Sequence, residues 1–243
     1  LVICAAWNVT YADSNRTNPI RVARVYSYDN GKTWQKPVDI TEDIYGLFDD
    51  RNNGKVQSLF FGSGRICQSR SVKTGNFYRL YAALCARGGN RVIYSDDFGL
   101  TWHVLGDINT SPAPSGDEPK CEELPDGSVV LSSRKYNGRY YNIFTFSNAE
   151  KAQGSWSDAV ATDTCTNGIT VLNNATNSEI LIVPARRRSD NTPVFLALQS
   201  IPFGNGRTNV GIYYKGLDSY EDFDTPTHFS ENWEGRYQCS RMG

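Results

Sequence analysis

The chain has 243 residues and nearly balanced charge, with 25 Lys and Arg against 26 Asp and Glu. This balance excludes a whole-molecule field that would recruit nucleic acid or an anionic membrane, so any anion must be bound by a few placed arginines. The 14 Tyr, 11 Phe, 5 Trp, 21 Gly and 10 Pro residues favour short strands joined by tight turns, which predicts an all-β protein.

The first hundred or so residues are predicted to form short strands around two similar turns. The apolar segment Leu1–Ala6 and the segment Ile20–Ser27 each predict a strand. The octet SYDNGKTW follows at residues 27–34. An almost identical octet, SDDFGLTW, stands at residues 95–102, again after a predicted strand, Arg91–Tyr94.

The two octets share Ser, Asp, Gly, Thr and Trp at the same five places. Ser and Asp side chains can bond to turn backbone, Gly accepts positive φ, and Trp supplies a large apolar anchor as the next strand begins. Each octet therefore predicts a hairpin turn that packs against its own sheet. Their recurrence indicates a repeat architecture.

The segment GDEPKCEELPDGSVVLSSR, at residues 116–134, combines charged groups with a second hairpin signal. Glu118 lies in a Gly- and Pro-flanked loop, ahead of the turn Pro125-Asp126-Gly127 and of a short strand that ends in Arg134. One hairpin is thus predicted to present a carboxylate and a guanidinium close together. They either face a ligand pocket or form a structural ion pair.

The remainder continues as short strands between turns, with weak helix signals and at best a short helical turn at Ser219–Phe223. We find no linker or low-complexity segment, so a single domain over residues 1–243 is the simplest organisation. The predicted strands are Tyr140–Phe146, Ile169–Leu172, Glu179–Pro184, Val194–Ser200 and Thr208–Tyr214.

The octets resemble the Asp boxes of sialidases and related β-propellers, and the 116–134 segment resembles the sialidase segment that carries an active-site glutamate and arginine. This resemblance implies a six-bladed β-propeller. Blades take roughly 40 to 50 residues each, so six need about 240 to 300. We therefore expect a sialidase-type catalytic domain that is incomplete at both ends.

The resemblance also implies the reaction, hydrolysis of terminal α-linked sialic acids from glycoproteins, glycolipids and oligosaccharides. Because the anomeric carbon of sialic acid bears a carboxylate, the family uses a tyrosine nucleophile instead of a carboxylate. A glutamate serves as its base, an aspartate as acid/base, and three arginines bind the substrate carboxylate. This chemistry predicts no metal and no cofactor.

Two residues match the family pattern directly, since Glu118 stands five places before Glu123 of a Glu-Leu-x-Asp-Gly signature and Arg134 follows 16 residues later. Arg207, in GNGRTNVGIYYK, resembles a further substrate arginine, with a solvated strand-entry charge as the alternative. Arg65, in the loop Gly62-Ser63-Gly64-Arg65, either lines the pocket or is simply exposed.

The ends of the chain fit less well. The family's first arginine and its nucleophilic tyrosine find no match, and Trp7 or Asn8 stands where the acid/base aspartate is expected. Asp13 is the nearest carboxylate and is our candidate for that role, against a solvated loop position. We therefore expect weak or no turnover from this chain, and a non-catalytic, lectin-like sialic-acid-binding propeller is the alternative function.

The six cysteines are widely spread without a CxxC pair, and with only two histidines they do not indicate a zinc site. We interpret them as buried core residues, with one or two disulfides as the alternative. No apolar run approaches the roughly 20 residues of a transmembrane helix, so no membrane insertion is expected. We expect a monomer that acts on sialylated glycoconjugates, in a secreted, periplasmic or cell-surface location suggested by that substrate class.

Overall fold

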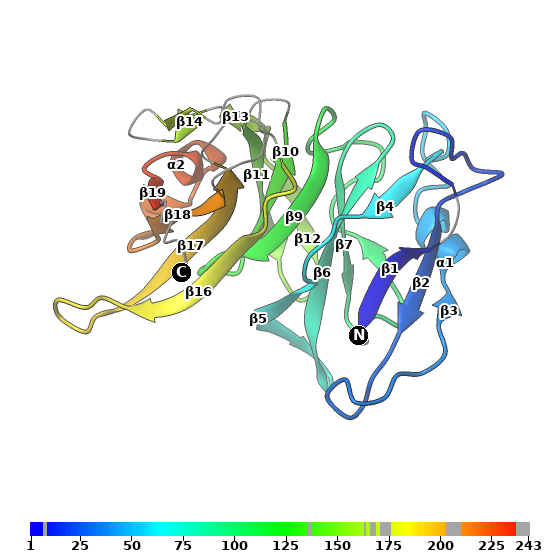
Figure 1. Cartoon of the computed structure of the whole chain (residues 1–243), viewed down its shortest axis with the longest axis horizontal. Helices are drawn as coiled ribbons and strands as arrows, with labels where there is room; N and C mark the ends of the chain where they lie inside the picture. Colours follow the sequence, from blue (N-terminus) through cyan, green and yellow to red (C-terminus); the bar gives the residue numbers. More distant parts are fainter. Residues whose placement is uncertain are drawn as a thin grey trace, which may run out of the picture.

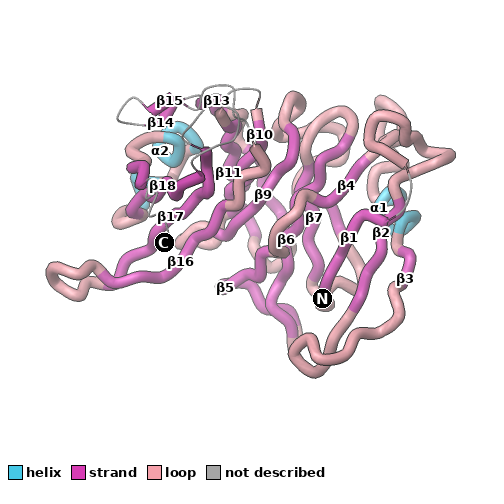
Figure 2. Tube along the Cα trace, viewed as in Figure 1, coloured by secondary structure: helices cyan, strands magenta, loops and turns pink. Residues whose placement is uncertain are grey.

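The computed structural model of the chain describes residues 1–6, 9–135, 138–162, 164–165, 169–170, 176–202 and 210–236. These residues form strands β1 to β19 and three short helical segments, α1 (Thr41–Gly46), η1 (Tyr220–Asp222) and α2 (Pro226–Ser230). Figure 2 shows the helices at the two ends of the view and strands between them. The all-β prediction is confirmed, and the weak helix signal at Ser219–Phe223 corresponds to η1.

Most of the strands belong to four antiparallel sheets that follow one another along the chain (Figure 1). The first sheet is formed, in order, by β1 (Val2–Ala6), β2 (Arg21–Val25) and β3 (Val38–Asp39). The second is formed by β4 (Leu59–Phe61), β6 (Phe77–Ala86), β7 (Arg91–Ser95) and β8 (His103–Val104), with β5 (Cys67–Thr74) also paired to β6.

The third and fourth sheets repeat this hairpin order. The third contains β9 (Asp117–Glu123), β10 (Val129–Arg134), β11 (Arg139–Asn148) and β12 (Gln153–Trp156), and β13 (Val160–Thr162) also pairs with β11. The fourth contains β16 (Ile180–Arg186), β17 (Pro193–Pro202), β18 (Val210–Gly216) and β19 (Glu234–Arg236). A separate two-stranded sheet joins β14 (Thr164–Cys165) to β15 (Ile169–Thr170).

In the described residues, three clusters of buried apolar side chains lie between successive sheets. Each pairs apolar residues of one sheet with those of the next, which removes them from water and holds the sheets face to face. Between the first and second sheets the cluster includes Val22, Leu84 and Ile93. Between the second and third sheets it includes Tyr81, Val129 and Leu131. Between the third and fourth sheets it includes Val130, Ile143 and Ile180.

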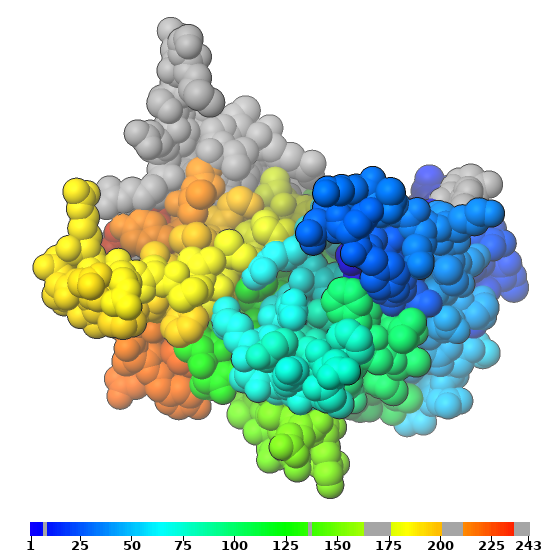
Figure 3. All heavy atoms as spheres, turned by 90° about the horizontal axis from the view of Figure 1, so that it is seen from below, coloured from blue at the N-terminus to red at the C-terminus, as the bar shows by residue number. Residues whose placement is uncertain are grey.

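This succession of face-packed antiparallel sheets is consistent with the blades of a β-propeller. In the space-filling view of Figure 3 the sequence colours pass in order across the molecule, from the first sheet to the fourth. The number of six blades stays a prediction.

Both octets form the same hydrogen-bonded turn. In the first, Asp29 accepts from the Thr33 N–H (2.8 Å) and hydroxyl (2.6 Å), and Ser27 Oγ accepts from the Gly31 N–H (2.8 Å). These bonds to Thr33 lower the pKa of Asp29 to about 2. Gly31 has φ +84°, which explains why glycine occurs at this place.

The second octet repeats these bonds but is covered by the first sheet. Asp97 accepts from the Thr101 N–H (2.9 Å) and hydroxyl (2.6 Å), and Ser95 Oγ accepts from the Gly99 N–H (2.7 Å). The carbonyl groups of Gly99 and Leu100 accept hydrogen bonds from Arg24 of β2. Trp102 is consequently 6% exposed, whereas Trp34 of the first octet is 50% exposed.

The four cysteines with described side chains are free thiols. Cys67, Cys85 and Cys121 are buried and Cys4 is exposed, so the core interpretation is confirmed for three of them. Within the described residues, no helix has the length and apolarity needed to cross a membrane.

Candidate active site

The structure brings Glu118 and Arg134 together. Glu118 lies near the start of β9 and Arg134 ends β10, where it pairs in register with Asp117. Arg134 Nη1 donates to Glu118 Oε2 at 2.7 Å. The two side chains are 29% and 26% exposed, so the pair is partly open to solvent.

A backbone irregularity places this pair. The β9–β10 register shifts between Ser132 and Arg134, which re-aims the side chains at the end of the hairpin. Glu118 has φ +27°, a sparsely populated conformation for a residue other than Gly, at a cost of order 1–3 kcal/mol. Such strain is often found at functional sites, and here it accompanies a partly exposed carboxylate.

Asp117 supports both members of the pair. Its Oδ1 accepts from the Glu118 N–H at 2.8 Å and from Cys85 Sγ at 3.4 Å, and its Oδ2 lies 3.6 Å from Arg134 Nη1. Burial raises the pKa of Cys85 to about 12, so this thiol keeps its proton and can donate it. No local sequence pattern indicates this role of Asp117, because Cys85 belongs to another sheet.

The loop between β1 and β2 reaches the same region through Tyr11. Cys85 Sγ lies 4.0 Å from the Tyr11 hydroxyl, and burial raises the pKa of Tyr11. The ring of Tyr11 packs edge-on against Phe60. Tyr11 also lines an open, mostly apolar hollow of about 620 Å³, together with Ala5, Ile20 and Phe60.

Two further cations lie close to the pair and are buried. Arg139 donates to Ser132 Oγ (3.0 Å), to the Ser132 carbonyl (3.0 Å) and to the Thr176 carbonyl (2.8 Å), and burial lowers its pKa to about 10. Lys120 is 4% exposed, and within the described part of the chain its Nζ has no hydrogen-bond partner. Burial lowers the pKa of Lys120, and the nearby Glu179 and Glu118 carboxylates offset part of that effect.

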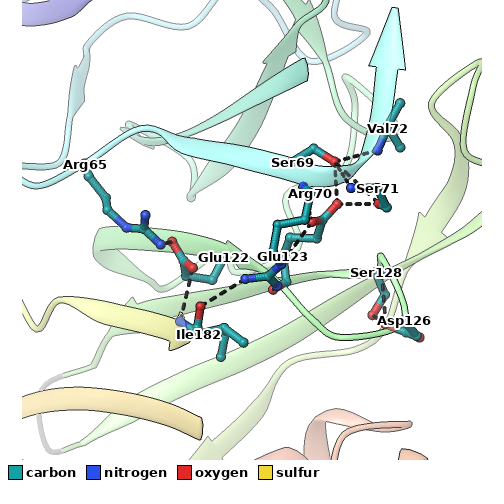
Figure 4. A network of polar contacts seen from close by, with 10 residues as sticks. All are labelled: Arg65, Ser69, Arg70, Ser71, Val72, Glu122, Glu123, Asp126, Ser128 and Ile182. Atoms are coloured by element: carbon teal, nitrogen blue, oxygen red, sulfur yellow. Dashed lines mark hydrogen bonds and ion pairs between the residues drawn. The ribbon is translucent and has the colours of Figure 1, made fainter. Parts of the chain in front are cut away.

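Arg65 points to a neighbouring carboxylate. It forms an ion pair of 2.5 Å with Glu122, whose side chain is 1% exposed, while Arg65 itself is 47% exposed (Figure 4). Together with Gly62, Gly64 and Lys120 it lines a small cavity of about 30 Å³. Its predicted contact with substrate stays a prediction.

Of the remaining predicted residues the structure describes Asp13, and no hydrogen bond or ion pair among the described residues joins it to the pair. Asp13 lies in the exposed loop after β1, where its carboxylate accepts from Thr10 Oγ1 at 2.5 Å. Arg207, and the positions Trp7 and Asn8, lie outside the described residues. In the described residues no three His, Cys, Asp or Glu side chains form a group that could hold a metal ion.

Comparison with known proteins agrees with the two octets. The sequence model of the BNR/Asp-box repeat matches residues 25–36 and 93–104. A sialidase of Paraclostridium sordellii is 31% identical over 149 residues, which cover 58% of this chain and 35% of that protein. A sialidase of Clostridium perfringens is 27% identical over 154 residues, which cover 57% of this chain and 36% of that protein.

The chain is sialidase-like. The expected resemblance to sialidases with Asp boxes is thereby confirmed. The sialidase-like chain spans about a third of the length of the curated relatives it matches. Within its described residues, the partly exposed Glu118–Arg134 pair presents a guanidinium that can bind a carboxylate.

Proposed function

We propose that this chain carries part of the active site of an exo-α-sialidase with a six-bladed propeller. The substrates would be terminal α-linked sialic acids of glycoproteins, glycolipids and oligosaccharides. The observation that carries the proposal is the Glu118–Arg134 pair, held by a strained residue at the open start of β9 in a sialidase-like chain.

Arg134 would bind the carboxylate of the sugar. A guanidinium has five N–H donors in a planar fork, so its bond to Glu118 does not use up its capacity, and carboxylates bind such forks in pairs of parallel hydrogen bonds. Arg207 would add a second guanidinium. The buried charges of Arg139 and Lys120 lie close enough to favour an anion electrostatically without touching it.

Glu118 would act as the base that helps a tyrosine hydroxyl attack the anomeric carbon. Its carboxylate is held by Arg134 on one side and is open to solvent on the other, so it can accept a proton in the site. Asp13 is our candidate acid/base, and it would have to leave Thr10 to fill that role.

The first experiment measures binding of sialic acid by calorimetry and turnover of a fluorogenic sialoside. We expect Arg134→Met to weaken sialic acid binding by at least about tenfold, as for loss of a charge-assisted hydrogen bond. Glu118→Gln should reduce any turnover far more than it reduces binding. Arg187→Met is the matched control, because Arg187 is exposed and paired with Asp190 and Asp218. Unchanged affinity in the Arg134 variant would refute the proposal.

A lectin-like propeller that binds sialic acid without cleaving it is the second candidate. The observation in its favour is the position of Asp13, whose carboxylate is occupied by its own loop. Saturable binding that depends on Arg134, without turnover in the complete gene product, would establish this function instead.

A further inference from the structure

Asp117 places a second carboxylate at the arginine that would bind the substrate. Its Oδ2 lies 3.6 Å from Arg134 Nη1, the nitrogen that also donates to Glu118. Arg134 therefore has two carboxylates within 4 Å. An anionic ligand that approaches Arg134 meets the negative charge of Asp117 as well as the positive charge of the guanidinium.

Asp117 is also anchored, so it cannot simply turn away when a ligand arrives. Oδ1 is held by the N–H of the strained residue Glu118 (2.8 Å) and by Cys85 Sγ (3.4 Å). These two donors come from different sheets. Releasing Oδ1 would leave the Glu118 N–H without its acceptor, which costs free energy wherever the group is shielded from water. The anchor therefore keeps Oδ2 beside Arg134.

We propose that Asp117 is a specificity-determining residue that competes with the carboxylate of an anionic ligand for Arg134. The proposal rests on the proposed function in taking sialic acid as the ligand. Asp117 lowers the affinity of the site for any anion but leaves the affinity for an uncharged analogue unchanged. Because the sialoside and the released acid carry the same carboxylate, Asp117 would lower the affinity of the site for both.

The substitution Asp117→Asn separates the charge from the anchor. An asparagine oxygen can still accept from the Glu118 N–H and from Cys85, whereas the group that faces Arg134 becomes neutral. Asp126→Asn is the matched control, because it removes one carboxylate charge from the turn at the other end of the same hairpin. There Asp126 caps the Ser128 N–H at 3.0 Å.

The test measures binding of sialic acid and of its methyl ester to the wild type and both variants by calorimetry, at low and high salt. We expect Asp117→Asn to bind sialic acid about fivefold more tightly than wild type. This is the change in affinity expected when one of two like unit charges about 4 Å apart in bulk water is removed. The gain should shrink in high salt, because Asp117 is half exposed and its field is screened. The methyl ester should bind the wild type and Asp117→Asn equally.

A second measurement keeps the test independent of sialic acid. Acetate is titrated while the Arg134 side-chain N–H resonance is followed by NMR, and Asp117→Asn should again bind more tightly. If wild type binds acetate at Arg134 but not sialic acid, the proposed function fails. The acetate affinities of wild type and Asp117→Asn then decide whether Asp117 competes for Arg134. An Asp117→Asn affinity for either anion that is unchanged or weaker, or a gain shared by the ester or by Asp126→Asn, would overturn the inference.

Discussion

The two ends of β9 carry the same kind of residue in two different environments. Near its start, Glu118 bonds to Arg134 and both side chains are more than a quarter exposed. At its end, Glu123 is 2% exposed and accepts from the Ser69 hydroxyl (2.5 Å), the Ser71 hydroxyl (2.6 Å) and the Arg70 N–H (2.5 Å). The second carboxylate has its acceptor positions filled by the protein, and the first does not.

This difference separates a structural carboxylate from one that is available to a ligand. The cluster in Figure 4 joins β5, β9 and β16, since Arg70 also donates to the Ile182 carbonyl at 3.0 Å. The buried carboxylate of Glu123, which accepts from this many donors, connects neighbouring sheets. A partly exposed carboxylate on a strained backbone, such as Glu118, does not hold sheets together and is available for chemistry.

The largest effect should come from Glu123→Ala. Removing this carboxylate leaves buried donors on Ser69 and Arg70 without their acceptor, and we expect the free energy of unfolding to fall by about 3–5 kcal/mol. Glu118→Ala should change it by less than about 1 kcal/mol, because exposed ion pairs contribute little. Urea unfolding of both variants measures the difference, and equal losses would remove the distinction between the two ends.

Arg65→Met should show the next largest effect. It leaves the buried Glu122 without its guanidinium, and we expect a loss of about 2 kcal/mol, within the range for hydrogen bonds to charged groups. Arg134→Met should cost less stability and yet weaken sialic acid binding by at least about tenfold. If Arg65→Met weakens sialic acid binding as strongly as Arg134→Met, then Arg65 does contact the ligand as the sequence suggested.

The pH dependence of stability should show the burial of Glu122. Burial raises its pKa above the ordinary 4.5, so the folded protein holds this proton more tightly than the unfolded chain does. The resulting contribution is present below pH 4.5 and is lost as the pH rises through the raised pKa. Relative to Glu122→Gln, the wild type should lose stability between pH 4.5 and neutrality in urea unfolding experiments. A constant difference would show that burial does not control this carboxylate.

The smallest effect on stability is expected for Lys120→Met, at a position between the two ends of β9. A buried ammonium without a hydrogen bond is a cost to folding, so its replacement by an apolar side chain should leave stability within about 1 kcal/mol of wild type or raise it. Thermal unfolding provides the measurement. A clear loss would mean that Glu179 is a closer partner than its effect on the pKa of Lys120 suggests.

The hairpin and its charged pair could be predicted from the sequence because their signals are local. The turn Pro125-Asp126-Gly127 fixes which strands pair, and the spacing of 16 residues then brings the side chain of Glu118 within hydrogen-bond distance of Arg134. The register shift that sets Asp117 opposite Arg134 has no such local signal. The turns of the two octets could be predicted for the same reason, since each turn is built from residues at most four apart.

The rest of the site depends on contacts between sheets, for which the sequence has no periodic signal. Arg65 lies 57 residues from Glu122, and Cys85 lies 32 residues from Asp117. The burial of Lys120 depends on glycines at positions 62 and 64, whose backbone approaches its Nζ where any Cβ would crowd it. Only the packing of several sheets decides these partners.

The two Asp-box turns have a consequence for the order of folding. Their hydrogen bonds close over at most four residues and are the same whether the tryptophan is 6% or 50% exposed, so neither turn needs a neighbouring sheet. Because short loops close at low entropic cost, we expect both turns to form before the sheets dock. Pulse-labelled hydrogen exchange should then protect the Thr33 and Thr101 amides early and together, and later protection of Thr101 would show that it waits for Arg24. A protein assembled in this way can grow one hairpin at a time.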